Sequence, residues 1–520
     1  MLARLSAAAV VGVEAIPVSV EVDVSGGGLP GMTMVGLPDT TVRESRDRVR
    51  TAIRNAGFQM PGSRVTVSLA PADMRKVGAA FDLPIALGIL AASGALPHFQ
   101  PRQLFIVGGL SLDGSVPPMR GVLPIAAAAR RAGAGLVFPE ANLAEAGIVE
   151  GLPLFPARSL FDAARILVAT NRQPVVAPPP ASPPASREDP LDLDEVKGQY
   201  LGRRALEIAA AGAHHLFFSG PPGAGKTMLA RRLPGILPPL SFEEALEVTT
   251  IHSVAGALPP GGGLVTARPF RAPHHTASDI ALVGGGSHPR PGELSLAHHG
   301  VLFLDELPEF SRRAIETLRQ PLEHGAIQIA RANGSITFPS RVMLVAAMNP
   351  CPCGFHRIDD KRCTCLSSAI DQYRRRASGP LLDRFDLRLD LAPVTWRELQ
   401  AAAPGEASAD VRSRVLASRE RQLARQGALN CKLEGTALRQ YAYPVDAAGT
   451  ALLGRAIARF GLSARGLTRV QRVARTIADL EASEAVEARH VAEALHFRMA
   501  DQAASDGANY EIADSAGQVW

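Results

Sequence analysis

The spacing of apolar and polar residues divides the chain into three parts. In the first part, apolar residues alternate with polar ones at 18–24 and 64–69, which predicts two half-buried strands. Apolar residues recur at helical spacing in the ranges 42–56, 79–92 and 123–132. This mixture of strand and helix patterns predicts an α+β domain over residues 1–170.

A proline-rich stretch follows the first part. The expected linker spans residues 171–190. Its run at 174–184, Pro-Val-Val-Ala-Pro-Pro-Pro-Ala-Ser-Pro-Pro, shows neither the helical nor the strand spacing of apolar residues. Because such a composition cannot pack a hydrophobic core, we expect a linker between two domains here.

The rest of the chain begins with short apolar runs at 216–219, 301–304 and 342–346, which alternate with helical patterns. Runs of this kind are typical of buried parallel strands, so residues 191–394 are expected to form an α/β domain. From about Thr395 only helical spacing remains, at 412–426, 447–460 and 467–481. We expect a helical lid over the nucleotide at 395–505 and a tail at 506–520.

Composition narrows the class of protein. The chain has 520 residues, of which 46% are hydrophobic and 20% are charged, so it can bury two or three domain cores. Its net charge of +5 suits a polyanionic partner without identifying one.

The first residues resemble a secretory signal, but Glu14 interrupts the apolar run and a strand pattern follows. No apolar run approaches the roughly 18 residues of a membrane span, so we expect a cytoplasmic protein with no membrane partner.

The most specific motif lies at 220–227. Its sequence, Gly-Pro-Pro-Gly-Ala-Gly-Lys-Thr, matches the phosphate-binding pattern G-x-x-x-x-G-K-[ST] between an expected strand and an expected helix. Backbone N–H groups would surround the phosphates, Lys226 would reach the β and γ oxygens, and the Thr227 hydroxyl would ligate Mg²⁺. The sequence therefore predicts ATP bound with Mg²⁺ by Gly220, Pro221, Pro222, Gly223, Ala224, Gly225, Lys226 and Thr227.

Two further strand ends carry groups that hydrolysis needs. Asp305 and Glu306 follow the apolar run 301–304. Asp305 would hold Mg²⁺ through its water shell, and Glu306 would orient and deprotonate the attacking water. Asn349 ends the next apolar run and could hold the same water from the other side, although alone it would be an ordinary turn residue. Together these residues predict an ATP hydrolase.

The order of these motifs, followed by Leu-Leu-Asp-Arg-Phe-Asp at 381–386, resembles the AAA+ superfamily over residues 191–500. Three segments are more specific, at 268–275, 291–300 and 378–384. They resemble the ComM type within the magnesium-chelatase-like group. Proteins of the ComM type are DNA helicases that drive branch migration. That resemblance implies a role in homologous recombination and in the uptake of transforming DNA.

The resemblance also assigns roles to single residues. It implies that Arg384 is an arginine finger that reaches the γ-phosphate of the neighbouring subunit, and hence that the protein is a homo-hexameric ring. It further implies that Arg465 is the second sensor arginine and that Gln199 lies in the segment behind the adenine. Arg384 could instead pair locally with Asp383 or Asp386, and Arg465 could instead cap its helix.

Four of the five cysteines form a cluster after Asn349. Cys351 and Cys353 are followed, after nine residues, by Cys363 and Cys365. Four thiolates satisfy tetrahedral Zn²⁺ and close a small loop, so residues 351–365 are predicted to hold structural zinc. His356 could replace one thiolate, and disulfides or free thiols are the alternatives. The histidine pairs at 274–275 and 298–299 are not expected to hold a catalytic metal.

The first domain resembles the Lon-protease-like fold, which is also the fold of ribosomal S5 domain 2. A Lon-type protease needs a Ser nucleophile and a Lys base. Ala80 stands where the resemblance places the Ser, and Leu123 stands where it places the Lys. Without these groups acyl transfer cannot begin, so the domain is expected to handle DNA or to stabilise a ring.

A hairpin is predicted at 328–338, where two alternating runs flank Asn333-Gly334. Related ring helicases point such a hairpin into their central pore. Arg331, near its tip, could contact a DNA phosphate regardless of base sequence, or it could be an ordinary exposed arginine. The sequence thus favours a branch-migration ATPase, with two rivals: a metal-insertion motor like magnesium chelatase, and a protein that only senses nucleotide state.

Overall fold

The computed structural model describes residues 1–25, 30–36, 40–72, 76, 78–97, 99, 103–169, 171–176, 191–259, 261–286, 289–331, 334–356, 362–377, 379–401, 405–442 and 445–503. Most of the expected linker, the hairpin residue Asn333 and the expected tail at 506–520 lie outside these ranges. Within them, no helix is both long enough and apolar enough to cross a membrane.

The first part of the chain folds around a seven-stranded mixed sheet with the strand order β3-β4-β2-β1-β5-β6-β7. The strands are β1 (Leu2–Val11), β2 (Glu14–Ser25), β3 (Gly31–Val35), β4 (Arg64–Ala70), β5 (Leu104–Ile106), β6 (Gly135–Pro139) and β7 (Leu154–Ala157). The helices are α1 (Thr40–Asn55), α2 (Asp82–Ala92), α3 (Val122–Arg131), α4 (Leu143–Ala146) and α5 (Leu160–Val168). All eleven residues of α2 are buried, and this helix packs against β1 and β2. The predicted α+β fold class is confirmed, and the segment that resembled a secretory signal is β1, in the middle of the sheet.

The second part is built on a five-stranded parallel sheet with the order β16-β8-β15-β12-β9. Its strands are β8 (Leu216–Ser219), β9 (Phe270–Arg271), β12 (Val301–Leu304), β15 (Met343–Met348) and β16 (Leu387–Asp390). The helices around it are α6 (Tyr200–Gly212), α7 (Lys226–Ile236), α8 (Phe242–Ala255), α9 (Asp279–Val283), α10 (Glu293–Leu296), α11 (Arg312–Thr317), α12 (Arg319–His324), α13 (Ser367–Arg376) and α14 (Gly379–Leu382). The three strands predicted from apolar runs are confirmed as β8, β12 and β15. Because the sheet is parallel, the segments that follow these strands all leave from the same edge.

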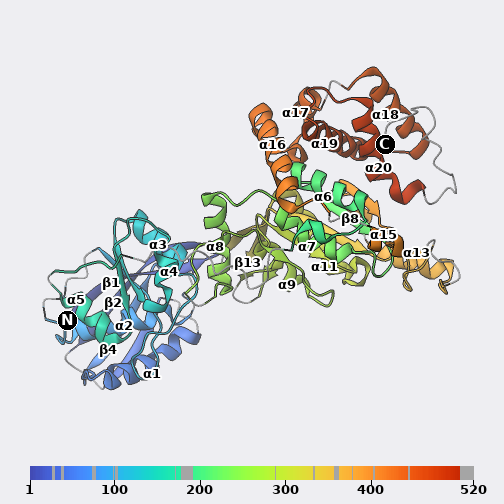
Figure 1. Cartoon of the computed structure of the whole chain (residues 1–520). Coiled ribbons are helices and arrows are strands. Elements are labelled where there is room, and N and C mark those ends of the chain that lie inside the picture. Colours follow the sequence, from blue (N-terminus) through green and yellow to red (C-terminus); the bar gives the residue numbers. More distant parts are fainter. Residues whose placement is uncertain are drawn as a thin grey trace.

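The predicted hairpin is confirmed as β13 (Ala326–Arg331) paired with β14 (Gly334–Pro339). From α15 onward the chain is helical, with α15 (Trp396–Ala401), α16 (Ser408–Gln426), α17 (Gly435–Tyr441), α18 (Ala447–Phe460), α19 (Ala464–Leu480) and α20 (Ala488–Ala503). Helices α16 and α19 pack on α6, and α20 packs on β16. Figure 1 shows the first part at one end, the parallel sheet in the middle and α16 to α20 at the other end.

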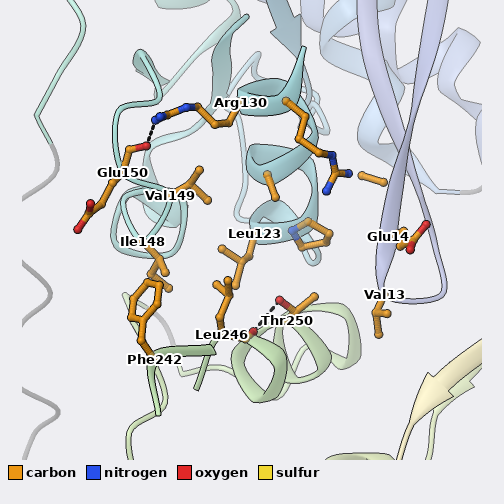
Figure 2. A pocket seen from close by; sticks show the side chains of 14 residues that line it. Val13, Glu14, Leu123, Arg130, Ile148, Val149, Glu150, Phe242, Leu246 and Thr250 are labelled. Atoms are coloured by element: carbon orange, nitrogen blue, oxygen red, sulfur yellow. Dashed lines mark hydrogen bonds between the residues drawn. The ribbon is translucent and has the colours of Figure 1, made fainter. Parts of the chain in front are cut away.

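The first part contacts the parallel-sheet part mainly through α8. The backbone N–H of Gly121 donates to the Ser253 carbonyl at 3.2 Å, and the Ser253 hydroxyl donates to the buried carboxylate of Glu145. Beside these bonds, α3 and α8 line an apolar cavity of about 630 Å³, whose lining side chains are shown in Figure 2. The turn between β1 and β2 also touches the hairpin, because a Cβ atom on Gly12 would lie 3.0 Å from Ile336 Cγ2. The two parts are therefore joined at both a helix and a hairpin.

Candidate nucleotide-binding site

The phosphate-loop motif connects β8 to α7 at the carboxyl edge of the parallel sheet. Gly223 and Gly225 have φ angles of +79° and +88°, which side chains rarely adopt. A Cβ atom on Gly220 would lie 2.6 Å from the Leu391 carbonyl oxygen. These three glycines are therefore required by the path of the loop. Helix α7 begins at Lys226, so its N-terminal N–H groups face the end of the loop.

Lys226 is buried at the centre of this edge. Its Nζ donates to the carbonyls of Gly220 and Pro221 at 2.6 and 2.9 Å, and to Asn349 Oδ1 at 3.0 Å. Burial lowers the pKa of Lys226, and the nearby carboxylates of Asp305 and Glu306 oppose that shift. The structure thus brings together Lys226 and Asn349, which lie 123 positions apart in the sequence.

The two adjacent carboxylates lie on the same edge. Thr227 Oγ1 donates to Asp305 Oδ2 at 2.8 Å, so the two predicted Mg²⁺ ligands face each other. The Glu306 backbone has a φ of +52°, and its N–H donates to Asp305 Oδ1 at 3.0 Å. A left-handed backbone of this kind is uncommon for a residue other than glycine, asparagine or aspartate.

One contact of Glu306 was missed by the sequence reasoning. His275 Nδ1 lies 3.3 Å from Glu306 Oε2. His275 follows β9, which pairs with β12, the strand that ends before Asp305. The sequence motifs did not reveal this strand order, so nothing along the chain connected the histidine with the glutamate.

Gln199 lies against the phosphate loop. Its Nε2 donates to the Ala224 carbonyl at 2.9 Å and to the Ala392 carbonyl at 2.7 Å. The residue therefore ties the loop to the segment that follows β16. Its neighbour Tyr200 begins α6 and is exposed.

The four cysteines of the predicted metal loop converge. Cys351 Sγ lies 3.3 Å from Cys353 Sγ and 3.9 Å from Cys363 Sγ, and the last two sulfurs are 3.7 Å apart. Cys365 completes a group of four sulfurs that all lie within 4.8 Å of one another. Tetrahedral Zn–S bonds of about 2.3 Å place sulfurs about 3.8 Å apart, so the donor set fits zinc. A disulfide requires sulfurs about 2.05 Å apart, and all four cysteines are free thiols here.

His356 is not one of the grouped donors. Its backbone N–H instead donates to Cys351 Sγ at 3.4 Å. Such N–H donors stabilise thiolates, and a hydrogen bond from the Phe355 backbone lowers the pKa of Cys353 to about 6. The loop also packs directly on the phosphate loop, because a Cβ atom on Gly354 would lie 2.5 Å from the Cδ of Pro222.

Arg384 and Arg465 do not lie at this edge. Both line a cleft of about 800 Å³ together with His215, Gly300 and Met343. These last three residues lie at the amino ends of β8, β12 and β15, whereas the phosphate loop follows the carboxyl end of β8. At about 3.3 Å per residue, strands of this length separate the two edges by more than about 13 Å. The expected lid therefore does not place Arg465 over the phosphate loop of its own chain.

Arg384 is paired, but not with the neighbours that the sequence suggested. Its guanidinium contacts Glu323 on α12 and donates to the Pro380 carbonyl at 2.8 Å. Asp383 and Asp386 instead pair with other arginines. Burial lowers the pKa of Arg384, Glu323 opposes this, and the charges of Arg319, Arg469 and Arg465 lower it further. Arg465 is exposed, and the side chain that caps its helix α19 is Ser463.

The pair His298–His299 meets Glu247 of α8. Glu247 Oε2 lies 2.8 Å from His298 Nε2 and 2.9 Å from His299 Nε2. His298 Nδ1 accepts the Arg341 backbone N–H at 2.9 Å, so Nε2 carries the ring hydrogen and donates it to Glu247. Burial lowers the pKa of His298 to about 4. A neutral ring with both nitrogens used in hydrogen bonds has no lone pair for a metal, which favours a structural role for this cluster.

The backbone of Arg331 pairs with Gly334 and closes the hairpin. The position of its side chain lies outside the described part of the structure. The base of the hairpin is fixed, because Ile327 and Phe338 are buried in the core beneath it.

Comparison with known proteins matches three parts of the chain to models named for one protein, the ChlI subunit of magnesium chelatase. Residues 192–399 match the family model described as magnesium chelatase, subunit ChlI. Residues 20–142 match the model of subunit ChlI of Mg-chelatase, and residues 405–498 match the model of its C-terminal region.

Relatives named YifB and ComM cover nearly the full chain, and a more distant one covers part of it. An uncharacterized protein YifB of Salmonella typhimurium is 45% identical over 502 residues, which are 96% of this chain and 98% of the relative. Competence protein ComM of Haemophilus influenzae is 44% identical over 501 residues, which are 96% of this chain and 97% of the relative. DNA replication licensing factor Mcm6 of Drosophila melanogaster is 28% identical over 221 residues, which are 40% of this chain and 25% of that protein. The chain therefore belongs to the magnesium-chelatase-like AAA+ family that includes YifB and ComM.

Proposed function

We propose that the protein is a Mg²⁺-dependent ATPase that works as a hexameric DNA helicase and promotes branch migration during homologous recombination. The observation that carries the proposal is the split between two edges of one sheet. Lys226, Thr227, Asp305 and Asn349 converge at the carboxyl edge, whereas Arg384 lies at the amino edge. A site that needs all of these groups has to be completed by a second copy of the chain.

The residues at the carboxyl edge suit phosphoryl transfer. Lys226 offers a positive charge to the β- and γ-phosphates, and Thr227 and Asp305 would hold Mg²⁺. When bound, Mg²⁺ neutralises phosphate charge and orients the leaving group. Glu306 would orient the attacking water and take its proton. Its contact with His275 holds the Glu306 carboxylate in place before the reaction. Asn349, held by Lys226, would support the same water.

The composite site gives a reason for a ring. An arginine supplied by a neighbour stabilises transition-state charge and is worth about 10³ to 10⁵ in rate. Arg384 and Arg465 line the same cleft, so a neighbouring nucleotide seated there would meet two arginines. The hydrolysis of one subunit would then depend on the position of the next.

The DNA assignment rests on the hairpin and the relatives. The β13–β14 hairpin carries Arg331 at its closing pair, and its base is buried in the core, as a phosphate-contacting pore element needs. ComM is a competence protein by name, which favours a role in natural transformation, and Mcm6 is named for DNA replication. DNA contacts would be made to phosphates, since a junction motor must ignore base sequence.

We also propose that the cysteine loop holds one structural zinc. Four sulfurs at tetrahedral spacing leave no open coordination position, which excludes a catalytic role for that ion. The zinc would fix the loop that packs on Pro222 and begins two residues after Asn349. Its role would be to hold the phosphate loop and Asn349 in place.

The rival functions fit less well. A metal-insertion motor would use the same ATPase residues but has no need of the cysteine loop. This chain lacks the nucleophile and the base of a Lon-type protease, because Ala80 and Leu123 stand in their places. Leu123 is also buried in α3. A passive nucleotide sensor would not need Glu306, Asn349 and Arg384.

DNA-stimulated ATP hydrolysis tests the DNA assignment. The rate is measured without DNA and with single strands, duplexes and four-way junctions of one sequence and then of a scrambled sequence. We expect stimulation by DNA that is largest for junctions and equal for both sequences. No response to any DNA would reject the helicase and favour the metal-insertion motor.

Mixing of variant subunits tests the composite site. Arg384→Ala should bind ATP normally and lose most hydrolysis, because its own carboxyl edge is intact. Lys226→Ala should lack nucleotide binding but still carry a working Arg384. Hydrolysis that reappears when the two variants are mixed supports the composite site, and its continued absence contradicts it.

A further inference from the structure

The short segment that carries Arg384 is held by two arginines of the C-terminal helices. Arg469 of α19 donates from Nη1 to the Arg384 carbonyl at 2.7 Å and to Asp386 Oδ1 at 2.6 Å. Arg498 of α20 donates to the Phe385 carbonyl and, at 2.9 Å, to Asp383 Oδ1. All four residues of the segment 383–386 are thus contacted by a guanidinium from outside the parallel-sheet part.

A second set of contacts joins the segment 383–386 to the residues just before β8. The Asp386 carboxylate is buried, and its Oδ2 lies 3.2 Å from His214 Nδ1. Although burial alone would raise it, the hydrogen bond and charge of His214 together with the charge of Arg469 hold the pKa of Asp386 well below its usual range. His214 directly precedes His215 and β8, the strand that leads into the phosphate loop. Asp386 therefore joins the Arg384 segment to the strand at the centre of the nucleotide site.

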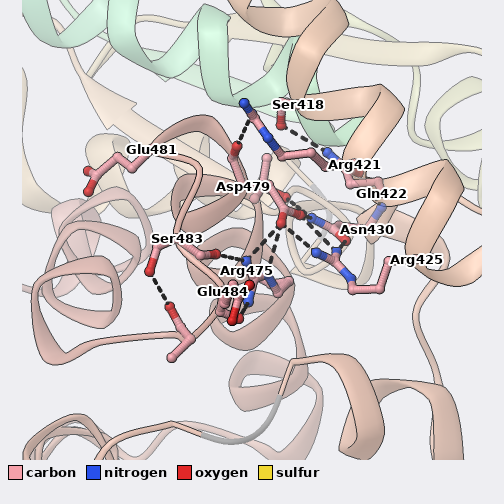
Figure 3. A network of polar contacts seen from close by, with 12 residues as sticks. Ser418, Arg421, Gln422, Arg425, Asn430, Arg475, Asp479, Glu481, Ser483 and Glu484 are labelled. Atoms are coloured by element: carbon pink, nitrogen blue, oxygen red, sulfur yellow. Dashed lines mark hydrogen bonds and ion pairs between the residues drawn. The ribbon is translucent and has the colours of Figure 1, made fainter.

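The contacts continue into the C-terminal helices. His214 Nε2 lies 2.8 Å from Thr476 Oγ1 on α19, and Asn430 Nδ2 donates to the same hydroxyl at 3.1 Å. Asn430 also donates to Asp479 Oδ2 at 2.8 Å. Figure 3 shows Asp479 buried between the guanidinium groups of Arg425 and Arg475.

This network makes α16 and α19 one unit. The Asp479 carboxylate accepts from two arginines and one amide, so its charge is fully compensated although it is buried. Arg425 comes from α16, and Arg475 comes from α19. Because buried charge pairs are costly to separate, these helices should move together rather than past each other. Arg469 is two helical turns before Thr476 on α19, so a displacement of this unit would be transmitted to Arg384.

We propose that Arg469 and Arg498 are positioning residues that set the place of Arg384 and couple it to the C-terminal helices. The inference rests on the proposed composite site. Neither arginine is required to touch nucleotide, since each binds the backbone or carboxylates of the segment 383–386. Fixing the Arg384 carbonyl fixes the start of its side chain, and a misplacement of about 1 Å at a reacting centre can cost about 100-fold in rate.

The test is Arg469→Ala in the full-length protein. We expect kcat for ATP to fall about 10- to 100-fold with KM changed less than about threefold, because the nucleotide of the same chain lies at the opposite edge. Arg469→Lys keeps a positive charge near Asp386 but replaces the planar guanidinium by a compact ammonium on a flexible stem, so it should retain the folded state and lose several-fold in kcat. Arg489→Ala removes an exposed arginine of α20 that pairs with Glu481 and Glu487, and it should leave kcat unchanged.

Mixed subunits separate a positioning role from a structural one. When Arg469→Ala subunits are mixed with Lys226→Ala subunits, the intact finger of the latter should restore hydrolysis in the intact nucleotide site of the former. A raised KM in Arg469→Ala, or no restoration on mixing while Arg384→Ala is restored, would overturn the inference alone. If Arg384→Ala is not restored either, the composite site itself has failed.

Discussion

The contact between the cysteine loop and the phosphate loop predicts that a single methyl group will impair ATP use. Gly354 has a φ of +86°, and a Cβ atom placed on it would lie 2.5 Å from Pro222 Cδ and 2.8 Å from Pro222 Cγ. Ordinary contacts of a Cβ atom begin near 3.4 Å. The ring of Pro222 is rigid and part of the phosphate loop, so Gly354→Ala has to push the two loops apart by about 1 Å.

The size of the effect follows from that displacement. A shift of about 1 Å in a phosphate-positioning element costs up to about 100-fold, and a tenfold loss corresponds to about 1.4 kcal/mol. We therefore expect kcat/KM for ATP to fall 10- to 100-fold, or by about 1.4 to 2.7 kcal/mol. The left-handed backbone adds about 1 to 2 kcal/mol of strain to the folded protein.

A matched control separates the two costs. Gly427 ends α16 with a φ of +68°, and a Cβ atom there would meet nothing within 4 Å. Gly427→Ala therefore carries the backbone strain without the collision. Steady-state ATPase kinetics and thermal unfolding of both variants should show similar losses of stability, but only Gly354→Ala should lose kcat/KM. Equal kcat/KM in Gly354→Ala and the wild type would refute the coupling between the loops.

Three further predictions concern binding, metal and pH. Lys226→Ala should abolish ATP binding, whereas Glu306→Gln should keep binding and stop hydrolysis; a nucleotide-binding titration beside an ATPase assay checks this, and equal loss of binding in both variants would contradict the roles. Protein purified under reducing conditions should contain about one zinc per subunit, and replacement of Cys351 and Cys363 together should release it and lower the unfolding temperature; elemental analysis without metal in the wild type would reject the site. Burial lowers the pKa of His215 to about 4, so the unfolded chain binds a proton that the folded chain does not, and stability should fall by roughly 3 kcal/mol between pH 6.5 and pH 4. His215→Asn keeps the acceptor for the Leu344 N–H and should flatten this part of a stability-against-pH curve, while an unchanged slope would exclude the histidine as its source.

The sequence was most informative where chemistry is carried by neighbours along the chain. The glycine spacing of the phosphate loop, the adjacent Asp305 and Glu306 and the paired C-x-C motifs are local patterns, and each was placed on a strand end that apolar runs had already predicted. A parallel sheet brings strand ends to one edge, so the meeting of Lys226 with Asn349 could be anticipated before the order of the strands was known.

Contacts that depend on strand order or helix packing could not be anticipated. His275 meets Glu306 only because β9 is the neighbour of β12. Arg465 was expected in a lid over the nucleotide, but α19 packs on α6 and carries it to the opposite edge of the sheet. Arg469 lies 83 positions after Asp386, and no pattern in either segment marks the pair.

ATP-driven branch migration measured on a labelled four-way junction tests the central claim most directly. The wild-type protein should convert the junction to duplex products at a rate that requires both ATP and Mg²⁺, and Glu306→Gln should bind the same junction without converting it. A wild-type protein that hydrolyses ATP but leaves every junction intact would contradict the proposed function.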